Sequence, residues 1–376
     1  MVRAIRLWPI AVSLSLLAAC GGKPDSEADA KAATPEDKVV NILNWSDYIG
    51  DTTVADFEKA TGIEVVYGVF DSNEVLETKL LAGRSGYDVV VPTAPFLERQ
   101  IKAGVYMKLD KSKLPNLKNM DPDIMQRTAA HDPGNLYAIT YLWGTVGLGY
   151  NPDMVKKALG TDTIDSWAAL LEPENAKKLA KCGIAMLDSP TDVFSSVAIY
   201  KGLDPNSEKP QDLKAVEDTL MKIRPYVRYF HSSSYINDLA AGEICLALGW
   251  NGDVLQARDR GAVAAKPVTV RYVIPKEGAI NYFDMLAIPA DAPHPDNAHA
   301  FLNYMMDPEV IAKVTNKVRF ANGNSASLPF VEDSIKNDSG IYPDAAARAR
   351  LHPDLVESQQ FSRELNRSWT RVRSGQ

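Results

Sequence analysis

Apolar and polar residues alternate along the first third of the chain in a regular order of short strands and amphipathic helices. Short β-branched or apolar runs are typical of strands, whereas apolar residues spaced three and four apart between a capping residue and a glycine are typical of helices. We therefore expect strands at 39–43, 63–70 and 89–92 and helices at 53–60, 73–82 and 95–103. This strand–helix order predicts a doubly wound α/β unit with a parallel sheet.

The middle of the chain repeats this pattern, and the last quarter is mostly helical. The expected strands are 183–187, 227–230, 244–250, 268–274 and 282–288, and the expected helices are 191–200, 235–241, 298–306, 308–316 and 362–372. We predict two α/β lobes of similar size, with the third quarter of the chain passing back toward the first lobe. Ligands in open α/β sheets bind beyond the carboxyl ends of the strands, so a cleft between the lobes is the expected binding site.

Three short segments, 44–48, 249–253 and 281–284, place a flat aromatic ring beside a carboxylate at or near such strands. An aromatic face attracts an ammonium group by about 2 kcal/mol once water is excluded. The carboxylate supplies the counter-charge that a buried ammonium needs to stay ionised. If the fold brings the three segments together, they form a site for a small organic cation.

Each segment also has an ordinary structural interpretation. Trp45 and Asp47 would then belong to a helix-initiating loop, and Trp250 and Asp253 would be a core ring and a helix N-cap. Asp284 is the clearest functional candidate, because a carboxylate in an apolar strand either faces a cleft or requires a partner. The occurrence of all three segments together favours the cation site.

Signals for catalysis are weak. The five histidines show no metal-ligand spacing, and the chain lacks a nucleophile elbow, a phosphate-binding loop and a dinucleotide-binding glycine motif. Paired carboxylates such as Asp253 and Asp284 also occur in glycoside hydrolases, so that alternative stays open. We predict a protein without enzymatic activity, without a metal ion and without a cofactor.

The N-terminus has the features of an export signal. Two arginines precede an apolar run at 7–17, which is followed by small residues and Cys20. We predict a signal peptide at 1–19 and a lipid-modified Cys20, as in bacterial lipoproteins; a plain secretory signal is the alternative. Residues 20–37 contain almost no large apolar side chain and are expected to form a flexible tether.

Charge and cysteine content narrow the choice of partners further. Loss of residues 1–19 would move the formal net charge from −7 to −9, which disfavours nucleic acid and suits cationic ligands. In the oxidising environment of an exported protein, Cys182 and Cys245 form a candidate disulfide, with two buried free thiols as the alternative.

Six longer stretches give a more specific signal: Asn-Trp-Ser-Asp-Tyr-Ile at 44–49, Val-Phe-Asp-Ser-Asn-Glu-Val-Leu-Glu at 69–77, Phe-Leu-Glu-Arg-Gln at 96–100, Tyr-Phe-His-Ser-Ser at 229–233, Tyr-Ile-Asn-Asp-Leu-Ala at 235–240 and Ile-Pro-Lys-Glu-Gly-Ala at 274–279. Through them the chain resembles the periplasmic polyamine-binding proteins of ABC importers, and most of all their putrescine-binding branch. The resemblance runs from about Val39 to the C-terminus.

The resemblance implies a two-lobed periplasmic binding protein of type II, which closes on its ligand. The N-terminal lobe would comprise 38–142 plus 259–311, and the C-terminal lobe 143–258 plus 312–376. It also implies that Cys182 is bonded to Cys245.

Carried over residue by residue, the resemblance implies a ligand site with three parts. The methylene chain and the ammonium groups would be lined by Trp45, Tyr48, Trp250 and Tyr282. One ammonium would be paired by Asp253 and Asp284. The other end or rim of the site would be formed by Ser46, Asp47, Thr93, Asp192 and Ser232.

Several positions depart from the putrescine-binding pattern. Asp192 stands in place of a glutamate, and Phe320, a further expected ligand contact, replaces a tyrosine; the other differences are Thr93, Pro95 and Ser189. We therefore expect a receptor for putrescine, with spermidine, cadaverine, agmatine or a role as a surface polyamine sensor as alternatives. The expected partners are the polyamine, ABC permease subunits and a membrane that holds the lipid anchor of a periplasmic monomer.

Overall fold

The computed structural model describes residues 36–376, which form one compact unit. The predicted signal peptide, the lipid-modified Cys20 and nearly all of the predicted tether lie outside the described residues. In the described part of the chain, no helix has the length and apolar character needed to cross a membrane. The contacts between residues do not separate this unit into two lobes, so the lobe boundaries given above stay a prediction.

The first elements follow the order predicted from the sequence. They are β1 (Val39–Trp45), α1 (Thr53–Thr61), β2 (Glu64–Phe70), α2 (Asn73–Leu81), β3 (Val89–Val90) and α3 (Ala94–Lys102). The three strands are parallel in the order β2-β1-β3, with Trp45 level with Phe70. Their carboxyl ends therefore lie at one edge of the sheet, where a ligand site is expected.

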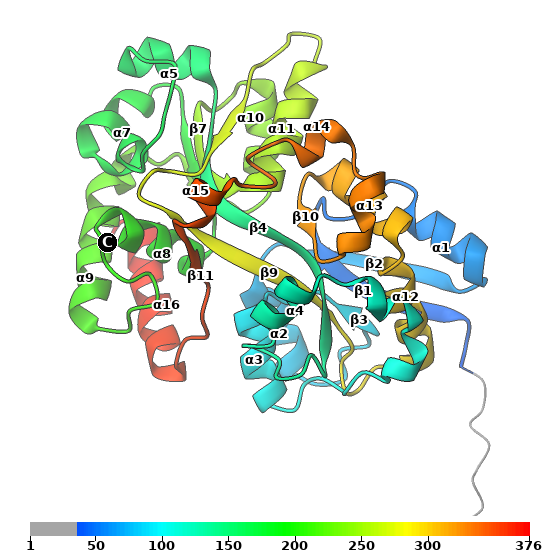
Figure 1. Ribbon diagram of the computed structural model, residues 1–376. Coiled ribbons are helices and arrows are strands. Elements are labelled where there is room, and N and C mark those ends of the chain that lie inside the picture. The colour runs from blue at the N-terminus through cyan, green and yellow to red at the C-terminus, as the bar shows by residue number, and fades with distance from the viewer. Residues whose placement is uncertain (1–35) are drawn as a thin grey trace, which may run out of the picture. The chain divides into compact units, whose positions relative to one another are not determined.

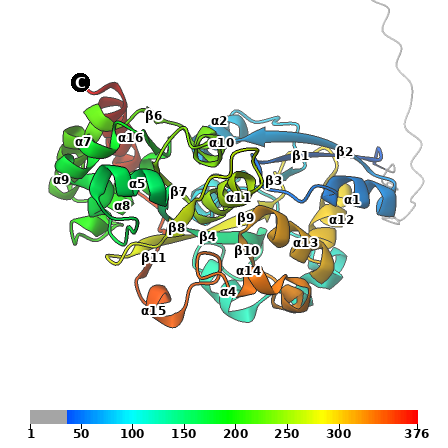
Figure 2. The same cartoon turned by 90° about the horizontal axis from the view of Figure 1, so that it is seen from above.

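The middle of the chain forms a second α/β group. Its principal elements are β5 (Ile184–Met186), α8 (Pro190–Tyr200), α9 (Pro210–Ile223), β6 (Tyr229–Phe230), α10 (Ser234–Ala241), β7 (Leu246–Trp250) and α11 (Asn251–Ala262). The strands are parallel in the order β7-β5-β6. Helices α5 (Pro152–Leu159), α6 (Ala168–Leu171) and α7 (Pro173–Leu179) precede them in the sequence. Helices α5 and α7 lie on the same side of the molecule as this group in both views (Figures 1 and 2).

Two long antiparallel strands, β4 (Ala138–Tyr150) and β9 (Ala279–Ala287), join the two groups (Figure 1). The first part of β4 pairs with β9, residues 146–150 pair with β7, and residues 148–150 also pair with β8 (Arg271–Val273). Nearly every residue of β4 is buried. The sequence analysis did not identify this strand, although it connects the two halves of the molecule.

The remaining elements complete both groups. They are α4 (Pro122–Thr128), α12 (Pro295–Met305), α13 (Pro308–Val318), β10 (Ala321–Asn322), α14 (Asp333–Lys336), α15 (Ala345–Arg348), β11 (Leu351–Pro353) and α16 (Gln359–Ser374), with 3-10 helices at Lys111–Lys113, Pro115–Asn119, Arg224–Tyr226 and Ser325–Phe330. Strand β11 runs parallel to β9, and α16 then packs on α8 and α9. The C-terminal segment therefore passes from one group to the other.

A disulfide joins Cys182 and Cys245, which confirms the predicted pairing. Both cysteines stand just before parallel neighbouring strands, since Ile184 of β5 is level with Leu246 of β7. The bond closes a loop with a sequence separation of 63 residues. Such a crosslink stabilises the fold mainly by restricting the unfolded chain.

We expect reduction of this disulfide to lower the free energy of unfolding by about 2–4 kcal/mol, because the restriction on the unfolded chain is lost. Chemical unfolding with and without a reductant measures the difference. The double variant Cys182→Ser, Cys245→Ser is the control, and reductant should not shift its transition. An unchanged transition in the reduced wild-type protein would contradict the expectation.

Candidate ligand-binding site

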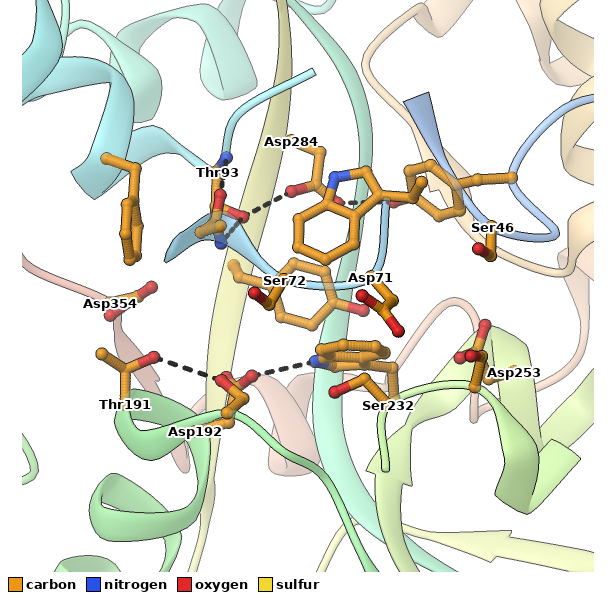
Figure 3. A pocket seen from close by; sticks show the side chains of 18 of the residues that line it. Ser46, Asp71, Ser72, Thr93, Thr191, Asp192, Ser232, Asp253, Asp284 and Asp354 are labelled. Atoms are coloured by element: carbon orange, nitrogen blue, oxygen red, sulfur yellow. Dashed lines mark hydrogen bonds between the residues drawn. The ribbon is translucent and has the colours of Figure 1, made fainter. Parts of the chain in front are cut away.

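One cavity lies where the two α/β groups meet, and all three aromatic–acid segments reach it (Figure 3). Trp45 is the last residue of β1, and Trp250 is the last residue of β7. Tyr282 and Asp284 are two residues apart on β9, so their side chains share a face of that strand. The structure thus brings together parts of the chain that are separated by more than two hundred residues.

The cavity is narrow, with an accessible volume of about 40 Å³. All of the predicted ligand contacts except Asp47 line it: Trp45, Ser46, Tyr48, Thr93, Asp192, Ser232, Trp250, Asp253, Tyr282, Asp284 and Phe320. A slot of this size suits a few heavy atoms in a chain better than a sugar ring.

The aromatic rings of the cavity are held in fixed orientations. The indole nitrogen of Trp45 donates a hydrogen bond to the carbonyl of Val91 at 2.8 Å, and the ring packs edge-on against Trp250 with centroids 5.7 Å apart. The ring of Phe320 packs against Tyr48 at 4.9 Å. It fits there because position 252 is a glycine, since a Cβ atom at Gly252 would overlap the Phe320 ring. The cavity therefore has rigid apolar walls.

Asp284 places a buried carboxylate in this cavity. It is only 4% exposed, and it accepts hydrogen bonds from the hydroxyls of Tyr48 at 2.7 Å and Thr93 at 2.8 Å. Burial raises its pKa to about 7, although the two hydrogen bonds favour the ionised form and limit the shift. A cation that entered the cavity would restore the ionised state.

Asp253 and Asp192 provide two further carboxylates, each in the first turn of a helix. Asp253 accepts a hydrogen bond from the Tyr235 hydroxyl at 2.8 Å, and Asp192 accepts one from the Trp250 indole at 3.1 Å. Burial raises the pKa of Asp253 to about 7 and that of Asp192 to about 6. Asp253 is not a helix N-cap, because Trp250 holds that position.

The cavity lacks a cation of its own within residues 36–376. No arginine, lysine or histidine side chain there forms an ion pair with Asp192, Asp253 or Asp284. The hydroxyl of Ser232, which is 4% exposed, also has no hydrogen-bond partner in this part of the chain. Buried charges are normally paired and buried hydroxyls normally have hydrogen-bond partners. The three carboxylates without a cation and the Ser232 hydroxyl are therefore arranged for a ligand.

Asp47 is a correction to the expected site, because the structure places it outside the cavity. Its side chain is exposed and forms an ion pair with Arg260 of α11 at 2.7 Å. The backbone of Asp47 has a φ of 54°, which turns the chain between Ser46 and Tyr48, both of which line the cavity. In such a turn the side chains of adjacent residues point in different directions. Asp47 therefore lies outside the cavity although its neighbours Ser46 and Tyr48 line it.

The cavity also contains residues that the ligand-contact prediction omitted: Asp71, Ser72, Asn73, Phe96, Ser189, Thr191, Ser233 and Asp354. Asp71 and Ser72 follow the carboxyl end of β2, so the rule that found Trp45 and Trp250 could have found them too. Asp354 follows the three-residue strand β11, which has no recognisable sequence pattern. Ser189 was identified only as a difference from the polyamine-binding pattern.

The site has no metal-binding arrangement among the described residues. Within 36–376, no three histidine, cysteine, aspartate or glutamate side chains are grouped so that they could hold a metal ion. The chemistry of the cavity is that of carboxylates, hydroxyls and aromatic rings. These groups can desolvate and neutralise an organic cation.

Comparisons with known proteins also indicate a ligand-binding protein. The family model described as bacterial extracellular solute-binding protein matches residues 52–342. The chain is 53% identical over 347 residues to the "putrescine-binding periplasmic protein SpuD" of Pseudomonas aeruginosa, covering 92% of this chain and 94% of that one. It is 52% identical over 342 residues to the "putrescine-binding periplasmic protein PotF" of Escherichia coli, covering 90% and 92%.

A solved structure extends the similarity to the fold. The "putative spermidine/putrescine ABC transporter" from Listeria monocytogenes superposes with a TM-score of 0.80 at 29% identity, covering 89% of this chain and 99% of that one. These matches confirm the predicted fold class, a two-lobed periplasmic binding protein of type II. They also agree with the prediction of a binding protein rather than an enzyme.

Proposed function

Because this chain belongs to the bacterial extracellular solute-binding protein family, we propose that it captures a small linear diamine, most specifically putrescine, and delivers it to an ABC importer. The observation that carries the proposal is a narrow cavity with buried carboxylates that have no cationic partner within residues 36–376. The names of the two relatives that are more than 50% identical support putrescine as the ligand.

The binding mechanism follows from the walls of the cavity. Trp45 and Trp250 would cover the methylene chain, which buries apolar surface and lets ring faces attract the ammonium groups. Asp253 and Asp284 would receive one ammonium, and Asp192 would receive the other. Each carboxylate would regain its charge as the ligand's charge is neutralised.

The lobes and the cellular location complete the proposal. The two proposed lobes are 38–142 plus 259–311 and 143–258 plus 312–376. Their closure around the diamine would be the signal that the permease recognises. The relatives named above are periplasmic, and we propose the same compartment for this protein. A lipid on Cys20 would hold the monomer at a membrane. A role in sensing polyamines would use the same site.

The direct test is a calorimetric titration of the protein at pH 8 with three ligands of similar size. Putrescine should bind with a Kd in the micromolar range or below. Butylamine, with one charge, should bind at least roughly 100-fold more weakly, because one carboxylate end then stays unneutralised. The neutral 1,4-butanediol should not bind. Comparable affinities for all three ligands would refute the proposed function.

We expect Asp192→Glu to shift selectivity toward shorter diamines. The longer side chain moves the carboxylate further into the slot, and this shortens the distance between the two anionic ends. The affinities for 1,3-diaminopropane, putrescine and cadaverine measure the shift, with Asp162→Glu, at an exposed site after α5, as the matched control. Unchanged affinity ratios would remove Asp192 from the selectivity mechanism.

A further inference from the structure

Tyr235 of α10 is a buried residue beside the ligand site that the proposed function does not use. Its side chain is 0% exposed, and it does not line the cavity. Its hydroxyl donates a hydrogen bond to the Asp253 carboxylate at 2.8 Å and accepts one from the Trp250 backbone N–H at 3.1 Å. A phenol has one hydrogen to donate, so this hydroxyl is fully engaged by two residues that do line the cavity.

The surroundings of Tyr235 keep its phenol protonated. Burial and the negative charge of Asp253 raise the pKa of Tyr235 well above its usual range. The hydroxyl therefore acts as the hydrogen-bond donor to the carboxylate at neutral pH. A hydrogen bond donated to an ionised carboxylate is stronger than one between neutral groups, and it favours the ionised form. Tyr235 thus supports the charge of Asp253 as well as its orientation.

The charged groups around Asp253 do not replace this support. Asp47, in the loop after β1, and Asp284 of β9 are negative, and both raise the pKa of Asp253 further. Arg260 of α11 has the opposite effect, but its guanidinium is paired with Asp47 at 2.7 Å. In the described part of the chain, the Asp253 carboxylate accepts a hydrogen bond from Tyr235 and from no other side chain.

The fold places the ring of Tyr235 against the end of β7. The ring lies over Gly249, where a Cβ atom would come within 2.6 Å of it. Trp250 follows as the last residue of β7, and Asp253 lies in the first turn of α11, which packs against α10. Because position 249 has no side chain, the phenol reaches the Trp250 amide and the Asp253 carboxylate at the same time.

The start of α10 is anchored as well. The Nδ1 atom of His231 accepts hydrogen bonds from the backbone N–H groups of Ser233 at 3.1 Å and Ser234 at 3.2 Å. The first N–H groups of a helix have no partner within the helix, so the imidazole satisfies groups that would otherwise be unpaired. Ser232 and Ser233 line the cavity, and Tyr235 follows them in this anchored turn. The phenol is therefore preorganised.

We propose that Tyr235 is a positioning residue of the diamine site, which holds the Trp250 backbone and keeps the Asp253 carboxylate ionised and turned toward the ligand. This inference rests on the proposed function and deepens it. Tyr235 would act through Asp253 and not by contact with the amine, because it does not line the cavity. Without its hydroxyl the carboxylate would take up a proton more readily, and a bound ammonium would lose its counter-charge.

The variant Tyr235→Phe tests this role, because it removes the hydroxyl and keeps the ring. Tryptophan fluorescence follows the binding of putrescine at pH 6 and pH 9, since Trp45 and Trp250 line the cavity. At pH 6 the affinity should fall at least roughly 10-fold relative to wild type, because Asp253, with a pKa of about 7, must lose a proton to bind. At pH 9 the loss should be at least about 3-fold smaller, since the carboxylate is then ionised in both proteins. A purely structural defect would lower the affinity by the same factor at both pH values.

Tyr229→Phe is the matched control. The Tyr229 hydroxyl donates to Asp238 of α10, so this variant removes a phenol–carboxylate hydrogen bond to the same helix, and neither residue lines the cavity. Its affinity for putrescine should stay within about 2-fold of wild type at both pH values. In an Asp253→Asn background the side chain at 253 cannot ionise. Adding Tyr235→Phe there should lower the affinity by the same factor at pH 6 and at pH 9.

The outcomes separate this inference from the proposed function. Wild-type affinity in Tyr235→Phe at pH 6, a loss of equal size at both pH values, or a pH-dependent loss that persists in the Asp253→Asn background would each overturn the role of Tyr235. Thermal unfolding shows whether each variant folds, and an unfolded Tyr235→Phe protein would overturn the role too, because the hydroxyl would then serve the fold. Failure of the wild-type protein to bind putrescine at either pH would instead overturn the proposed function.

Discussion

Asp284→Asn is expected to lower the affinity for putrescine by roughly 100-fold or more. The substitution keeps the size of the side chain but removes the negative charge, so an ammonium would be buried without its counter-charge, at a cost of about 2–5 kcal/mol. Asp253→Asn should have a loss of the same order, because its carboxylate is similarly buried and similarly lacks a cationic partner within residues 36–376. Calorimetric titration at pH 8 measures both.

The control for these variants is Asp162→Asn, which removes one exposed carboxylate and so changes the net charge equally. Its affinity for putrescine should stay within about 2-fold of the wild-type value. Near-UV circular dichroism and thermal unfolding show whether the variants keep the native packing. Wild-type affinity in a correctly folded Asp284→Asn or Asp253→Asn variant would exclude that residue from the ligand site.

Affinity for putrescine should rise steeply between pH 5 and pH 8. The pKa values of Asp253 and Asp284 are about 7 in the ligand-free protein, and that of Asp192 is about 6. The ligand's ammonium groups stay charged across this range, as lysine does. Since the diamine binds the ionised carboxylates, each group with a pKa of about 7 should contribute up to roughly 100-fold.

Proton counting provides the matching measurement. At pH 6, binding of the diamine should release protons, and calorimetry in two buffers with different ionisation enthalpies gives their number. Asp253→Asn should release fewer protons than wild type, whereas Asp162→Asn should release the same number. An affinity that does not change between pH 5 and pH 8, with no proton release, would contradict the raised pKa values and their role.

The same raised pKa values have the opposite effect on the stability of the ligand-free protein, because they make its free energy of unfolding fall as the pH rises. In the unfolded chain these aspartates ionise near pH 4, so between pH 4 and pH 7 the folded protein holds protons that the unfolded chain has lost. Their contribution to the free energy of unfolding is thus present at low pH and is lost as the pH rises through about 7. Bound diamine reverses this loss, so its stabilising effect should be larger at pH 8 than at pH 5.

The sequence predicted the parts of the fold that local patterns determine. Strands such as β1 and β7 are short apolar runs that precede helices, and Trp45 and Trp250 follow from the rule that ligands bind at the carboxyl ends of strands. Asp284 was identifiable because a carboxylate in an apolar strand is unusual. The disulfide was predictable because few cysteines are present.

Other parts depend on contacts that no local pattern reveals. Strand β4 is a long apolar run without a turn signal, and only its pairing with β9 and β7 shows that it joins the two halves. Asp354 reaches the cavity through the pairing of β11 with β9, more than sixty residues earlier in the chain. Asp47 lies outside the predicted site because a left-handed turn and its ion pair with Arg260 hold the side chain elsewhere.

A crystal structure of the protein with putrescine at pH 8 tests the central claim most directly. The account predicts one diamine in the slot between Trp45 and Trp250, with both ammonium nitrogens at hydrogen-bonding distance, about 2.7–3.2 Å, from carboxylate oxygens. At least one of those carboxylates should belong to Asp253 or Asp284. A diamine bound outside this cavity, or inside it with neither of these aspartates in contact with nitrogen, would contradict the account.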